Sequence, residues 1–123
     1  MSFTPYLENK LLDHVLTNTA YTAPTTLYVS LWNGDPLSGG SEITGSGYSR
    51  QSAAFSVTAS AGANTNNVEF QATADWGTVN YAGIHDALTG GNMLISANLQ
   101  QTRTIVDEDI VRFSIGDIDV TLT

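Results

Sequence analysis

The residues of this chain best suited to catalysis are two histidines and a scatter of serines and aspartates. A serine, a histidine and an aspartate can form a nucleophilic triad, in which His14 or His85 would be the general base. No serine lies in a Gly-x-Ser-x-Gly elbow, the motif that anchors such a nucleophile. His85 and Asp86 stand where a strand pattern ends, as polar pairs often do, and two distant histidines without a third ligand motif make a poor metal site. The sequence therefore predicts no catalytic residues and no enzyme activity.

Two acidic clusters could supply oxygen ligands to Ca²⁺. One is Asp107-Glu108-Asp109 and the other is Asp117 with Asp119, and neither has the spacing of an EF-hand loop. A Ca²⁺ ion at either turn would stabilise the fold and would not catalyse a reaction. Gly45-Ser46-Gly47 is too short to cradle a phosphate, and no lysine follows it. We expect no metal site and no cofactor.

Four aromatic residues could instead bind a ligand. If Trp32, Tyr48, Trp76 and Tyr81 line one exposed groove, their rings could stack on sugars. If the rings are buried, they contribute to the packing of the protein. The burial of these rings therefore distinguishes a carbohydrate-binding module from a structural protein.

The composition excludes several classes of function. The 123 residues suffice for a single domain spanning 1–123, and the absence of cysteine excludes disulfides and thiolate chemistry. Only 4 basic residues oppose 12 acidic ones, a net charge of -8 that argues against binding to nucleic acid. No apolar run approaches the ~20 residues of a membrane span, and the first residues lack a signal-peptide pattern. We expect a soluble protein without membrane insertion.

One helical pattern precedes all other elements. Thr4 suits the N-cap and Pro5 the first helical position of a helix over about 5–17. Its apolar stripe consists of Leu7, Leu11, Leu12, Val15 and Leu16. Because a helix of this length is marginal alone in water, the stripe must pack against its own domain or a partner. We expect it to cover an open end or edge of the domain and to contribute to a contact with another subunit.

The remaining chain alternates apolar and polar residues in short runs typical of β-strands. Strands are expected at 25–32, 48–57, 68–70, 79–86, 93–99, 103–106, 110–115 and 118–122, with loops at 37–47 and 59–66. Since no helix separates the strands, they favour an all-β, antiparallel β-sandwich, jelly-roll-like, over a parallel sheet. The predicted core contains Leu27, Val29, Leu31, Phe55, Phe70, Val79, Ile95, Val111, Phe113 and Val120. Ile115, Ile118 and Leu122 are expected to face inward as well.

The segment Asn18–Trp32, followed by Gly34-Asp35-Pro36, resembles the opening of a family of small tailed-bacteriophage proteins commonly labelled tail-fibre or virion proteins. Further matches keep the same order: Gly47–Gln51, Ala72–Val79, Gly83–Ala87 and Gly90–Asn92. The resemblance covers nearly the whole chain, including the leading helix. At His85 an aromatic or apolar residue would be expected, a departure that concerns local packing.

The resemblance implies a non-enzymatic structural protein of the virion, assembled in the cytoplasm of the bacterial host. We expect a surface-exposed accessory subunit that contacts other capsid or tail proteins. Because no long repeat could build a fibre shaft, capsid decoration is favoured over a tail or fibre-base component. Both faces of 27–32 are apolar, which together with the resemblance predicts a homo-oligomer, with a trimer favoured. The alternative is a carbohydrate-binding β-sandwich module for attachment to the host surface.

Overall fold

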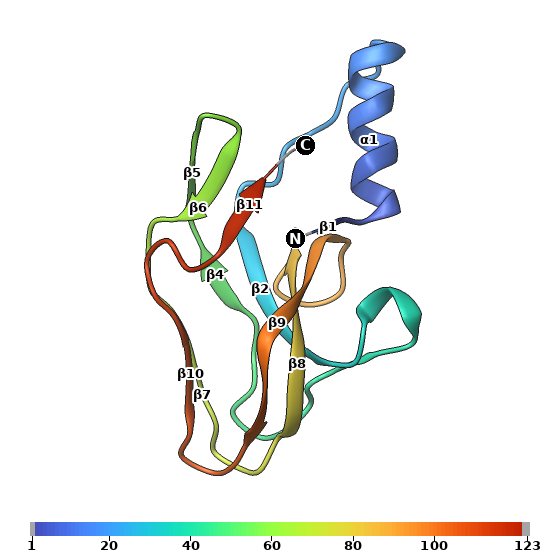
Figure 1. The fold of residues 1–123 in the computed structure, drawn as a ribbon. Helices are drawn as coiled ribbons and strands as arrows, with labels where there is room; N and C mark the ends of the chain where they lie inside the picture. Colours follow the sequence, from blue (N-terminus) through green and yellow to red (C-terminus); the bar gives the residue numbers. More distant parts are fainter. Residues whose placement is uncertain (1, 122–123) are drawn as a thin grey trace.

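The structure is a computed structural model that describes residues 2–121, and its elements are strands apart from one α-helix and one short 3-10 helix (Figure 1). The helices are α1 (Pro5–Leu16) and η1 (Pro36–Ser38). The strands are β1 (Ser2–Phe3), β2 (Leu27–Asn33), β3 (Ser41–Glu42), β4 (Gln51–Ala53), β5 (Phe55–Thr58), β6 (Ala61–Asn64), β7 (Val68–Gln71), β8 (Gly77–His85), β9 (Met93–Ile105), β10 (Ile110–Phe113) and β11 (Asp119–Thr121). The prediction of an all-β protein with a short N-terminal helix is confirmed.

The strands form three antiparallel sheets. The main sheet has the order β1-β9-β8-β2-β3, and β4 also pairs with β2. A ribbon of β7 and β10 and a small sheet of β11, β6 and β5 complete the fold. In Figure 1 the ribbon stands opposite β8 and β9, so the layers form a sandwich-like arrangement.

The core lies between the main sheet and the β7–β10 ribbon. All predicted core residues belong to it. The fully buried ones are Val29, Leu31, Phe70, Val79 and Val111, and the half-buried ones packed against them are Leu27, Phe55, Ile95, Phe113 and Val120. The period-two alternation therefore identified the inward face of each of these strands correctly.

The predicted strand 48–57 is divided at Ala54. The Ala54 N–H donates to Asn66 Oδ1 (2.9 Å), and its carbonyl accepts from Thr65 N–H (2.8 Å). These bonds to a neighbouring loop let β4 join the main sheet and β5 the small sheet. Alternation continues through Ala54 in the sequence, which is why the pattern does not reveal the change of sheet.

The loop expected at 59–66 is wrong, because β5 and β6 form a hairpin there. Ala59 and Ser60 close it with positive φ angles of 52° and 67°. Tight hairpin turns need such angles and usually recruit glycine or asparagine, so these two residues gave no turn signal.

The ends of the last strands also differ from the prediction. β10 stops at Phe113, and Ile115 lies 63% exposed in the following turn, so its inward assignment was wrong. Ile118 is buried as predicted, whereas Leu122 lies outside the described residues. The expected strands 93–99 and 103–106 are one continuous strand, β9.

Candidate functional site

The helix α1 is attached to the sheet at its N-terminal end. Buried Thr4 donates its backbone N–H to the Leu94 carbonyl (2.9 Å) and its hydroxyl to the Met93 carbonyl (2.7 Å). The same hydroxyl oxygen accepts from Leu7 N–H (3.4 Å) and thereby caps the helix, as the sequence predicts. Leu7 is the buried residue of α1, so the first turn is firmly seated.

Beyond this turn α1 presents its apolar stripe to solvent. Leu12, Val15 and Leu16 are 56%, 76% and 74% exposed, whereas Leu11 is half-buried. Figure 1 shows the helix projecting from the molecule, with its first turn next to β1 and β9. It does not cover an open end or edge of the sandwich as expected. The exposed stripe (Leu12, Val15 and Leu16) is therefore the candidate docking surface.

The structure brings one serine and one histidine together. His85 Nε2 lies 2.8 Å from Ser30 Oγ, because Tyr28–Trp32 pairs with Tyr81–His85 across β2 and β8. Ser30 is 0% and His85 is 3% exposed. Because His85 Nδ1 has no hydrogen-bond partner among the described residues, no carboxylate orients the ring. A nucleophile that substrate cannot reach and a base without an orienting group do not make a triad. The sequence did not predict this contact between Ser30 and His85, because it depends on the register of β2 against β8.

His85 instead fills the position of an apolar residue. Burial first, and then the positive charge of Arg50, lower the pKa of His85 to about 4, so its ring is neutral at pH 7. The ring lies parallel to Trp32, with centroids 6.4 Å apart. Nε2–H can donate to Ser30 Oγ, whose own hydroxyl then donates to the Gly83 carbonyl (3.4 Å). This arrangement leaves the Nδ1 atom as a buried acceptor without a hydrogen-bond partner in the described part of the chain.

A second polar cluster ties the loops to the sheet. Arg50 Nε and Nη2 donate to the two oxygens of Glu42, each at 2.9 Å, and Nη1 donates to the carbonyls of Ala87 and Gly90. The Tyr48 hydroxyl donates to Glu42 at 2.6 Å. Burial would raise the pKa of Glu42, but the hydrogen bonds from Arg50 and Tyr48 outweigh it and hold that pKa below its usual value. The donors and acceptors satisfy one another, which is typical of a structural clamp.

The four aromatic rings do not line one groove. Trp76 is buried, and Tyr48 stacks on Phe70 (6.0 Å) and meets Trp76 edge-on (5.5 Å). Trp32 and Tyr81 are half-buried and lie opposite each other on β2 and β8. Two rings therefore belong to the core and two to the outer face of the main sheet, which favours the structural interpretation.

The glycine-rich loop at 45–47 packs around Trp76. The Ser46 carbonyl accepts from the indole N–H (2.9 Å), and a Cβ atom at Gly45 would lie 2.2 Å from the indole ring. Only glycine leaves room for this ring. The loop thus serves the corner at Trp76 and has no geometry for phosphate.

The acidic turns use their carboxylates within the chain. Asp109 Oδ2 accepts from Val106 N–H (3.0 Å), and Asp117 Oδ2 accepts from Ser114 N–H (2.9 Å). Within the described residues, no group of three potential metal ligands comes together. These carboxylates act as turn caps.

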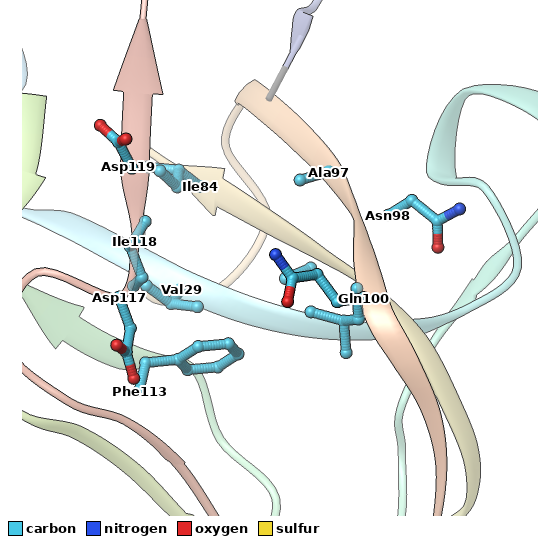
Figure 2. A pocket seen from close by; sticks show the side chains of 11 residues that line it. Val29, Ile84, Ala97, Asn98, Gln100, Phe113, Asp117, Ile118 and Asp119 are labelled. Atoms are coloured by element: carbon cyan, nitrogen blue, oxygen red, sulfur yellow. The ribbon is translucent and has the colours of Figure 1, made fainter. Parts of the chain in front are cut away.

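A cavity of about 530 Å³ with a mixed polar and apolar lining lies between the main sheet and the segment from Phe113 to Asp119. Figure 2 shows side chains from both layers around it, with Gln100 directed into the space and Asn98 pointing away. Its lining consists of Val29, Ala82, Ile84, Ala97, Asn98, Leu99, Gln100, Phe113, Asp117, Ile118 and Asp119. Its polar members are Asn98, Gln100, Asp117 and Asp119, and the Asp117 carboxylate already accepts from Ser114 N–H as a turn cap.

The described helices include none that could span a membrane.

Two comparisons with known proteins bear on the identity of the chain. A comparison with curated proteins finds no match. A family model described as "Podophage GP4 fiber I protein gp80" matches residues 2–121, almost the full length. This agrees with the resemblance of the sequence to phage virion proteins. The chain therefore belongs to the podophage GP4 fiber I protein gp80 family, a family of virion proteins of the fibre type.

Proposed function

We propose that the chain is a non-enzymatic, homo-oligomeric subunit of the phage fibre that is held to its neighbours by the exposed stripe of α1. The observation that carries this proposal is the solvent exposure of Leu12, Val15 and Leu16 on a helix whose first turn is buried and whose N-cap is hydrogen-bonded to β9. Family membership supports a place among other virion proteins. Assembly in the host cytoplasm belongs to the same proposal.

Physical reasoning favours a protein partner for this stripe. Full burial of one aliphatic side chain stabilises a contact by about 1.5–3 kcal/mol, and three such residues lie together here. A helix of 12 residues gains further order when its free turns pack. Association of three α1 helices around an axis would bury the stripes symmetrically, which is why we favour a trimer.

The family description supports a fibre position, whereas the absence of a long repeat in the sequence favoured capsid decoration. The number of copies per particle separates these positions. Quantitative mass spectrometry of purified virions should find few copies for a fibre component and hundreds for a decoration protein.

The main test changes the exposed stripe. Leu12→Asp and Leu16→Asp each place a charge in the proposed contact and should abolish oligomers and incorporation into particles. Lys10→Gln is the matched control, because it alters the net charge by the same amount and lies 200° around the helix from Leu12. Leu11 is less suitable because it is already half-buried in the single chain.

Sedimentation velocity and particle composition report the result, with far-UV circular dichroism as the check on folding. Monomeric, β-folded Leu12→Asp protein that is missing from particles would support the proposal. Unchanged oligomers and unchanged incorporation of both Asp variants would refute it.

A further inference from the structure

The turn that leads out of β2 contains the pair Asn33-Gly34, and Asn33 is the sole asparagine of the sequence that precedes a glycine. Such a pair is chemically labile, because glycine has no side chain to shield its backbone nitrogen from the amide carbon before it. The Gly34 nitrogen can lose its proton to hydroxide and attack Asn33 Cγ. The new N–C bond closes a succinimide while ammonia leaves with a proton from water, and water then opens the ring to aspartate or isoaspartate.

The fold requires the glycine of this pair. Gly34 has a φ angle of 90°, which lies in the left-handed region that favours glycine. The Asp35 carbonyl accepts from Gly40 N–H (2.7 Å), and a Cβ atom at Gly40 would overlap the carbonyl of Gly34. The tight closure of the η1 loop therefore keeps a glycine directly after Asn33.

The amide of Asn33 is open to solvent. Asn33 is the last residue of β2 and is exposed, and its side chain makes no hydrogen bond to another described residue. Water and hydroxide can therefore reach both atoms that form the ring. Solvent access does not protect this pair, so any protection must come from its conformation.

Two contacts hold the pair in an unreactive conformation. The first is the pairing of Asn33 with Ser41 across β2 and β3. The succinimide ring includes the Cα–C bond of Asn33, so it closes only at a ψ angle that an extended strand does not adopt. The second is Asn80 Oδ1, which accepts from Gly34 N–H at 2.7 Å. This bond retains the proton that must leave and holds the nitrogen in place.

The bond to Asn80 is the stronger of these two restraints. β3 has two residues and lies at the edge of the main sheet, and Figure 1 shows the η1 loop projecting from the side of that sheet. Short pairings at an edge open at a lower free energy than the centre of a sheet. Asn80 instead belongs to β8, which lies between β9 and β2. Its side chain therefore decides how often the Gly34 nitrogen becomes reactive.

We propose that Asn33-Gly34 is a site of spontaneous deamidation and that Asn80 is a positioning residue that keeps the reaction slow in the folded chain. Opening of the η1 loop releases Gly34 N–H and lets the ring close. The product carries a new negative charge on a chain whose net charge is already -8, and isoaspartate also lengthens the backbone between β2 and the η1 loop. The site is independent of α1 and of the proposed function.

The test is peptide mapping of the full chain by mass spectrometry after incubation in warm, mildly alkaline buffer. Electron-transfer fragmentation separates aspartate from isoaspartate at position 33. The chain unfolded in guanidinium chloride gives the rate of the unprotected pair. Asn33 should be the asparagine that reacts fastest in the unfolded chain, and it should react more slowly in the folded chain. Equal rates at Asn33 in the folded and unfolded chain would overturn the proposal.

Variants assign the role of Asn80. Asn80→Ala should raise the rate of deamidation of Asn33 in the folded chain roughly three- to tenfold, the equivalent of one hydrogen bond. Hydrogen exchange of the Gly34 amide, followed by NMR, should accelerate by a similar factor. Asn80→Asp keeps an acceptor oxygen and should keep most of the protection.

Asn67→Ala is the matched control, because Asn67 Oδ1 accepts from Ile115 N–H (3.1 Å) in a different loop. It should leave the rate at Asn33 unchanged. In guanidinium chloride all variants should react at the wild-type rate, which shows that the intrinsic chemistry is the same. Equal rates in folded wild type and folded Asn80→Ala, or an equal rise in Asn67→Ala, would overturn the role of Asn80.

Discussion

The side chains of the main sheet and those of α1 differ in how far they are buried and paired within the chain. At the sheet, Glu42 of β3 pairs through two hydrogen bonds with Arg50, which precedes β4, and Phe70 of the facing ribbon packs between Tyr48 and Phe113. In α1, the first turn is capped and buried, but Leu12 and Leu16 face solvent. The strands satisfy most of their interactions within the chain, whereas the helix leaves the apolar stripe exposed. Under the proposed function the strands supply stability and the exposed stripe supplies association, so mutations should separate the two.

The largest effect is expected in the core. Phe70→Ala removes a fully buried ring and should lower the free energy of unfolding by about 3–5 kcal/mol. Urea denaturation followed by Trp fluorescence measures this change. A loss below ~1 kcal/mol, the average for any substitution, would contradict the central role of this ring.

The next effect depends on pH. The folded pKa of His85 is about 4 against 6.5 in the unfolded chain, so the unfolded state takes up the proton first as pH falls. Stability should therefore decrease from pH 6.5 towards pH 4, by up to about 3 kcal/mol for this residue. His85→Phe should remove this part of the pH dependence. Because Glu42 adds a loss at the acidic end, the comparison of wild type with His85→Phe, and not the absolute curve, is the measurement.

A smaller loss of stability is expected when the Glu42–Arg50 pair is broken. Arg50→Met leaves the largely buried Glu42 carboxylate without its cation and should cost roughly 2 kcal/mol. Adding Glu42→Gln should recover part of the loss, and a double-mutant cycle gives the coupling. If the two single losses simply add, the pair does not act as a unit.

The smallest effect on stability is expected in the exposed stripe of α1. Val15→Ser should change the free energy of unfolding by less than ~0.5 kcal/mol, because the side chain is exposed. The same substitution should weaken oligomers in sedimentation. A large loss of stability in the monomer would show that the stripe packs on its own domain.

The sequence predicted most of the fold because alternation marks buried positions. Val29, Phe70 and Val111 were assigned to the core from their period alone and are buried. The hairpin turn at 89–92 carries its own signal, since Gly90 and Gly91 adopt φ angles of 62° and 67°. Ala59 and Ser60 take similar angles without such a signal, and hence their hairpin was missed.

The polar clusters could not be predicted in the same way. Ser30 and His85 meet through strand register over 55 positions, and Glu42 reaches Arg50 across a loop. The turn after β2 reaches the side chain of Asn80 over 46 positions. Contacts of this kind depend on tertiary geometry, which a single sequence does not encode locally.

The irregular pairing within β9 bears on how the protein survives at high concentration. Between the pairs Val79–Arg103 and Tyr81–Asn98, one residue of β8 faces four of β9, so the strand bulges outward. β1 covers the free edge of β9 only at Ile95 and Ser96. A long, flat edge would invite neighbouring copies to add strands without limit, and a bulge prevents such a register from forming. At high concentration this kink would keep copies of the chain from adding strands to one another at this edge.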